Sequence, residues 1–228
     1  MLDVAPKTIA VFSDPHCPWA HLAVYRLLST RRRLGLDGQV VLDHRAFPLE
    51  LFNRRPTPKR ILDAEIPVVG GLAPEAGWEV WQGRESAYPV TMLLAFEAIL
   101  AAKDQSLAAS EQLDRALRVA FLAESRCISM RHVILEVAEK CDLVDAVALE
   151  EALDDGRARR TILEHMAQAQ ELNVQGSPQL ILADGYTVHN PGIESHWAGD
   201  KGVGFPVITN DDPSVYETIL WRAAEVDS

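Results

Sequence analysis

The chain has 228 residues, of which 48% are hydrophobic and 24% are charged, and its formal net charge is -11 at pH 7. A chain of this length can bury a large core without disulfide bonds or metals, and the composition excludes a disordered or fibrous protein. The negative charge excludes non-specific binding to nucleic acid, which requires a surplus of Lys and Arg on one face.

The N-terminal sequence and the cysteines indicate the compartment. The segment MLDVAPKTIA lacks the basic and apolar parts of a signal peptide, and no apolar run approaches the roughly 18 residues of a membrane span. The three cysteines, Cys17, Cys127 and Cys141, are too few for a disulfide framework, which is typical of a reducing environment. We therefore expect a cytoplasmic protein that does not bind membranes.

The first predicted elements are a strand and a long helix joined by a sharp turn. Residues 9–12 (IAVF) form an apolar run rich in strand formers, and a Ser-Asp-Pro turn separates them from Cys17. Pro18 suits the first turn of a helix, where its missing N–H would have no partner. Three arginines at 31–33 and Gly35 predict the end of this helix.

Cys17 is the candidate reactive group, because it stands at the start of this helix. The first amides of a helix have no intrahelical partners, and the helix dipole places partial positive charge there. This predicts a Cys17 pKa below the ordinary value of about 8.5 and a nucleophile at neutral pH. The neighbouring His16 would add to the effect when protonated.

The chain continues with a second strand and then an irregular segment. Residues 40–44 predict a strand that pairs parallel with the first, across the intervening helix. Residues 52–88 are rich in proline and glycine and predict a lid or binding loop. Within it, Trp78, Trp81 and Arg84 are candidates to close over the thiol, to cap the following helices or to form a dimer contact.

The second half of the sequence predicts a block of helices followed by further strands of the sheet. Residues 90–172 have apolar residues at helical spacing, with breaks near 106–110, 126–129, 141–145 and 154–156, which predicts four or five helices. Residues 179–185 predict a strand that turns at Asp184-Gly185 into a hairpin. We expect a Gly-rich loop after Gly192 and a final helix from Asp212 through Trp221.

Two motifs resemble the DsbA-like family of thioredoxin-fold proteins, particularly its FrnE-like branch. SDPHCPWA, residues 13–20, resembles the family's Cys-Pro-Trp-Cys elbow, and VQGSPQLILADG, residues 174–185, resembles its cis-proline loop. The resemblance implies an α/β thioredoxin-like fold with a central sheet of parallel and antiparallel strands and an inserted all-helical subdomain. It implies one domain over 1–228, with thioredoxin-like parts at about 6–52 and 173–228 and the insertion at about 86–172.

The resemblance also implies a site. Pro178 would be cis and lie against the sulfur of Cys17, so these two residues are the candidate catalytic pair. The backbone of Ser177 would then be free to pair with a substrate. The expected substrate-binding residues are His16, Pro18, Trp19, Gly176 and Ser177. The histidines and cysteines show no metal-ligand spacing, so no metal is expected.

The chain departs from the family at Ala20, where dithiol members have their second cysteine. Cys17 could attack a disulfide, but another thiol would have to resolve the mixed disulfide. We therefore expect a DsbA-family oxidoreductase with no tightly bound cofactor, which uses glutathione or mycothiol as co-substrate and acts on a small-molecule thiol or a disulfide-bearing substrate.

Two alternatives remain open. Kappa-class glutathione transferases and 2-hydroxychromene-2-carboxylate isomerases share this fold, but they place a serine at the elbow to bind the glutathione sulfur. A thioredoxin-fold protein without turnover, which only binds a ligand, is the third reading. The sequence also leaves a homodimer open.

Overall fold

A four-stranded mixed sheet lies at the centre of the protein, and the computed structural model describes residues 2–225. The strands run in the order β2-β1-β3-β4, where β1 (Thr8–Ser13) is parallel to β2 (Val41–Ala46) and antiparallel to β3 (Gln179–Leu182). β4 (Thr187–His189) completes the sheet as the antiparallel partner of β3. The predicted parallel pair and the hairpin at Asp184-Gly185 are confirmed.

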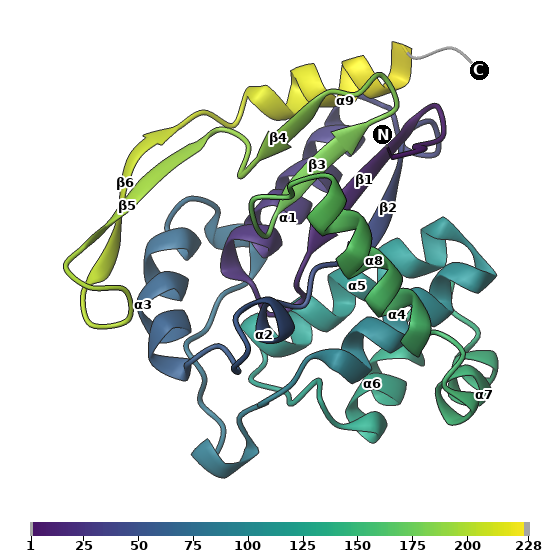
Figure 1. Ribbon diagram of the computed structural model, residues 1–228, viewed down its shortest axis with the longest axis horizontal. Coiled ribbons are helices and arrows are strands. Elements are labelled where there is room, and N and C mark those ends of the chain that lie inside the picture. The colour runs from purple at the N-terminus through teal and green to yellow at the C-terminus, as the bar shows by residue number, and fades with distance from the viewer. Residues whose placement is uncertain (1, 226–228) are drawn as a thin grey trace.

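Helices cover both faces of this sheet (Figure 1). Because side chains alternate along a strand, Ile9 and Val11 pack with α1 (Pro18–Arg33) and α9 (Val215–Glu225). Ala10 and Phe12 point to the opposite face, where they pack with Ala169 of α8 (Arg159–Glu171). β1 is therefore buried on both sides, and its C-terminal end leads directly to Cys17.

The predicted helical block consists of five helices between β2 and β3. These are α4 (Leu93–Gln105), α5 (Leu107–Leu122), α6 (Arg131–Ala138), α7 (Ala146–Asp155) and α8. α4 to α7 share one large apolar core, and α5 packs against β2. The architecture is thus the expected α/β fold with inserted helices. No helix of the described residues is long and apolar enough to span a bilayer.

Two segments differ from the prediction. Residues 52–88 contain a regular helix, α3 (Lys59–Gly70), which follows the one-turn helix α2 (Leu49–Phe52). The prolines in this segment obscured α3, since Pro58 caps its start and Pro67 lies inside it. Its buried residues, Ile61, Leu62, Glu65, Ile66, Val69 and Gly70, recur at helical spacing and form the face that packs on the protein.

The second difference is a hairpin where a loop was expected. β5 (Ile193–Ala198) and β6 (Phe205–Asp211) form a separate two-stranded sheet. Gly199 and Gly202 in its connecting segment have positive φ, which favours glycine and explains why this segment was read as a loop throughout. The hairpin extends from the main sheet and packs along α3 (Figure 1).

The central strands should carry much of the stability. Leu180 of β3 is fully buried, so Leu180→Ala should lower the free energy of unfolding by about 2–5 kcal/mol through the cavity it leaves. Leu163→Ala on α8, where the side chain is 61% exposed, should change it by less than about 0.5 kcal/mol. Urea unfolding of both variants measures the difference, and equal losses would contradict the assigned core.

Candidate active site around Cys17

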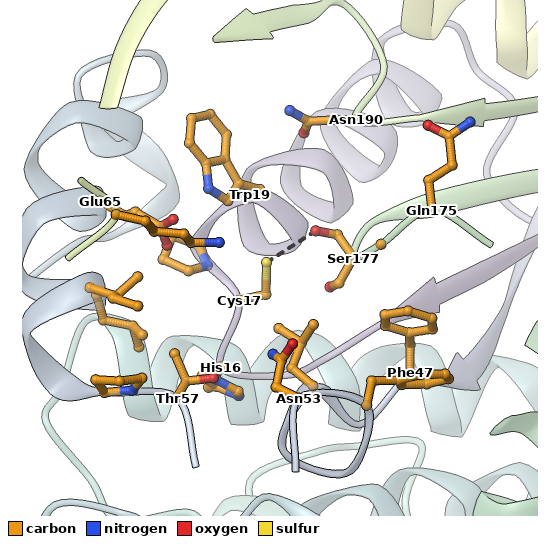
Figure 2. A pocket seen from close by; sticks show the side chains of 18 of the residues that line it. His16, Cys17, Trp19, Phe47, Asn53, Thr57, Glu65, Gln175, Ser177 and Asn190 are labelled. Carbon is orange, nitrogen blue, oxygen red and sulfur yellow. Dashed lines mark hydrogen bonds between the residues drawn. The ribbon is translucent and has the colours of Figure 1, made fainter. Parts of the chain in front are cut away.

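Cys17 lies at the corner between β1 and α1 and faces the loop before β3. It is the N-cap residue of α1, and Pro18 occupies the first helical turn, as predicted. Its Sγ donates a hydrogen bond to the carbonyl oxygen of Ser177 at 3.2 Å (Figure 2). The peptide bond between Ser177 and Pro178 is cis. Two segments 160 positions apart in sequence therefore meet at the sulfur.

Asp14 connects the parts of this corner. Its backbone N–H donates to Ser177 Oγ at 2.9 Å, which ties the β1 end to the Pro178 loop. Its carboxylate accepts from the backbone and ring of His16 and, at 2.9 Å, from the backbone N–H of Leu49 at the start of α2. The backbone and side chain of this one fully buried residue thus join the corner to the Pro178 loop and to the start of α2. In the sequence Asp14 is recognisable only as a turn residue, and its role at the site was not predicted.

A buried ion pair of α5, Arg118 with Asp114, contacts the corner at the end of β1. Arg118 is 0% exposed and donates to both carboxylate oxygens of Asp114, to Ser13 Oγ at 2.7 Å and to the carbonyl oxygen of Asp14 at 2.8 Å. Burial by itself would raise the pKa of Asp114, but the neighbouring Arg118 brings the pKa below its ordinary value. The helical block therefore holds the end of β1 in place.

A pocket of about 660 Å³ opens beside the sulfur. Its walls come from the corner itself, from α2 and α3, from the loop before β3 and from the β5–β6 hairpin, and Figure 2 shows the side chains that line it. The apolar lining includes Trp19, Phe47, Phe52 and Trp197. The mixture of apolar walls with a few polar groups is typical of a small-molecule site.

All the catalytic and substrate-binding candidates from the sequence except Pro178 line this pocket. Lining residues among them are His16, Cys17, Pro18, Trp19, Gly176 and Ser177. Pro178 does not line it; its carbonyl oxygen is held by His189 at 2.9 Å and by the Asn190 N–H at 3.0 Å. Gly176 leaves room for the His189 ring, which an added Cβ would approach to 2.9 Å.

Trp78, Trp81 and Arg84 do not line the pocket, so the alternative in which they close over the thiol is wrong. Trp78 packs against Gly70 and His21, and its indole N–H donates to the Ala73 carbonyl at 2.8 Å. Trp81 is buried against Tyr88 and Phe121 in the helical core. Of the proposed alternatives, packing on the helical block describes both tryptophans, because their apolar rings complete its core.

The expectation of a lowered Cys17 pKa is also wrong. Cys17 is only 5% exposed, and burial raises the pKa of its thiol to about 11. The carboxylates of Glu65 and Asp14 add to the rise, whereas Ser177 and the Ala20 amide act in the opposite direction. The helix start is present as predicted, but desolvation and two nearby negative charges outweigh it.

Glu65 is the second site residue that the sequence analysis missed. It extends from α3 on the Cys17 side of the pocket (Figure 2) and is 6% exposed. Burial raises the pKa of its carboxyl, while Trp19, Lys201 and His16 act against the rise. A carboxylate on the apolar face of residues 59–70 was the available signal, but it becomes visible only once α3 is recognised as a helix.

The fold and this site define a thioredoxin-like protein with one cysteine at its elbow. Residues 83–199, just over half of the chain, match the DSBA-like thioredoxin domain, and the chain belongs to this family. The match includes the Ser177–Pro178 loop but not the Cys17 elbow. No curated protein matches the sequence.

Solved structures share this fold over most of the chain. The cytosolic disulfide reductase DsbM from Pseudomonas aeruginosa, solved with GSH, is 16% identical, with a TM-score of 0.68, over 96% of this chain and 100% of that one. A probable DsbA oxidoreductase from Streptomyces coelicolor is 18% identical, with a TM-score of 0.69, over 97% and 92%. A 2-hydroxychromene-2-carboxylate isomerase is 17% identical, with a TM-score of 0.58, over 79% and 87%.

The raised pKa predicts how Cys17 responds to pH. Because the thiolate is the reactive form, iodoacetamide labelling of Cys17 should accelerate about tenfold per pH unit from pH 7 to pH 10. Peptide mass spectrometry assigns the label to Cys17, and free cysteine under the same conditions provides the reference. A rate that is already constant at pH 7 would show that the helix start outweighs burial.

The buried ion pair predicts a large loss on mutation. Arg118→Met leaves the Asp114 carboxylate buried without its partner, so it should lower the free energy of unfolding by about 3–5 kcal/mol. Arg126→Met breaks the Arg126–Glu136 pair at the surface and should cost no more than about 1 kcal/mol. Comparable losses in urea unfolding would show that Arg118 does not support the corner.

Proposed function

We propose that this protein catalyses thiol–disulfide exchange on small molecules through Cys17. The observation that carries the proposal is the placement of the Cys17 sulfur, 3.2 Å from the Ser177 carbonyl, at the wall of a pocket of about 660 Å³. A disulfide bound in this pocket would meet the only cysteine among the lining residues. The family contains oxidoreductases and isomerases, which agrees with an enzyme.

The reaction has two steps that balance in atoms and protons. Cys17–SH reacts with R–S–S–R to give Cys17–S–S–R and R–SH, so that the ligand S–S bond breaks and the Cys17 proton passes to the leaving sulfur. A second thiol, R′–SH, then attacks the mixed disulfide, releases R–S–S–R′ and returns Cys17 to the thiol. The protein is neither oxidised nor reduced over the cycle.

The resolving thiol has to come from outside the protein. Position 20, which would carry a second cysteine, is a fully buried alanine. Cys141 belongs to the core of the helical block, and Cys127 packs against that core, so neither lies at the pocket. Glutathione or mycothiol is therefore the proposed co-substrate, and the DsbM structure with GSH supports a thiol of this kind.

The Ser177 backbone would orient the ligand. In the described residues its N–H donates to no backbone or side-chain acceptor, although its carbonyl accepts from Cys17. A peptide-like thiol lying in extended form along residues 176–178 could accept this N–H and bring its sulfur to Cys17. A reducing, cytosolic setting, as in the name of DsbM, belongs to the same proposal.

One observation favours a second function. Because burial raises the Cys17 pKa to about 11, the group at neutral pH is a thiol, which donates a hydrogen bond much as a hydroxyl does. In that case Cys17 would stabilise the thiolate of a bound glutathione without forming a disulfide, and the enzyme would act as a transferase or isomerase. Turnover that survives Cys17→Ser would favour this reading.

Incubation with glutathione disulfide tests the main proposal. Intact mass should show one added glutathione, peptide mapping should place it on Cys17, and excess glutathione should remove it. Cys17→Ser should lose the adduct, while Cys127→Ser, whose cysteine lies away from the pocket, should keep it. An adduct on Cys127 or Cys141, or none on the wild type, would refute thiol–disulfide exchange at this site.

A further inference from the structure

Glu65 is a buried carboxylate for which the described residues provide no counter-ion. It is 6% exposed and lines the pocket together with Cys17, yet it makes no ion pair within 4.0 Å. The other carboxylate of α3 differs in this respect, since Asp63 pairs with Lys59 at 2.6 Å. Trp19 is the hydrogen-bonding neighbour of this carboxyl, but a carboxylate that is removed from water without an opposite charge beside it is costly, and a cation in the pocket would offset that cost.

The positive charges of the pocket lie elsewhere. Lys201, at the exposed connection between β5 and β6, is close enough to affect the pKa of Glu65 but forms no ion pair with it. Arg55 is also exposed and contributes to the lining from the segment after α2. The pocket thus has a negative group at depth near the sulfur and cations toward solvent.

We propose that Glu65 makes the Cys17 pocket selective for thiols and disulfides that carry an ammonium group close to their sulfur. This inference rests on the proposed exchange reaction and adds its substrate class. The ammonium group would pair with the Glu65 carboxylate while the ligand sulfur reaches Cys17. Aminothiols and cysteine-like compounds with a free amino group have this arrangement.

The pairing would also assist the reaction. The negative charge of Glu65 disfavours the Cys17 thiolate, and a ligand cation at Glu65 would cancel part of that effect. A ligand of the correct charge would therefore both bind and ease loss of the Cys17 proton. With a neutral ligand of the same shape, the Glu65 carboxylate would continue to disfavour the Cys17 thiolate.

Three disulfides of similar size and different charge test this inference. Cystamine is cationic, 2-hydroxyethyl disulfide is neutral, and dithiodiglycolate is anionic. The rate of mixed-disulfide formation on Cys17 is followed by intact mass and divided by the rate of the same disulfide with 2-mercaptoethanol, which removes intrinsic reactivity. The wild type should prefer cystamine over the neutral disulfide by about tenfold and disfavour the anionic one.

Variants assign the preference to Glu65. Glu65→Gln should reduce the preference to about twofold or less. Asp63→Asn removes a carboxylate from the same helix outside the pocket lining and should retain it. Lys201→Gln, a change at an exposed position that does not depend on how Glu65→Gln folds, should increase the preference because it removes an opposing cation.

The outcomes separate the two proposals. A wild type that reacts with none of the three disulfides overturns the exchange reaction and this inference with it. Equal normalised rates for all three overturn only the role of Glu65. Faster reaction with dithiodiglycolate would assign the selectivity to the rim cations and also overturn it, as would a preference for cystamine that Glu65→Gln retains in full.

Discussion

The contact between the Cys17 sulfur and the Ser177 carbonyl is the constraint on which the site depends. It joins the start of α1 to the loop before β3, and the backbone of Asp14 makes a second link to the same loop. The Asp14 carboxylate extends the connection to α2, and Arg118 anchors it to the helical block. The inserted helices therefore stabilise the corner at which Cys17 lies, through the contacts of Arg118 with the end of β1.

The electrostatics of the corner differ from those of a thiol activated by a helix alone. Burial removes Cys17 from water, and Glu65 and Asp14 place negative charge near it, so the resting group is a thiol. Such a site would be inert toward general electrophiles and would gain reactivity when a ligand changes its surroundings. Ala20 agrees with a resting thiol at Cys17, because the elbow has no second cysteine with which Cys17 could form a disulfide.

Much of the fold could be predicted because its signals are local. Short runs of neighbouring residues predict the elbow at Cys17, the hairpin at Asp184-Gly185 and the breaks in the helical block. α3 was missed because Pro67 in a helix interior is tolerated only when packing supports the helix. The pKa of Cys17 could not be predicted, since it depends on burial and on Glu65, which is 48 positions away and reaches the thiol only through the fold.

A crystal structure of the protein after reaction with glutathione disulfide tests the central claim most directly. The account predicts continuous density from Cys17 Sγ to the sulfur of a single glutathione, whose backbone lies along residues 176–178 and accepts the Ser177 N–H. A glutathione attached to Cys127 or Cys141, or one that leaves Cys17 in a direction away from Ser177, would contradict it.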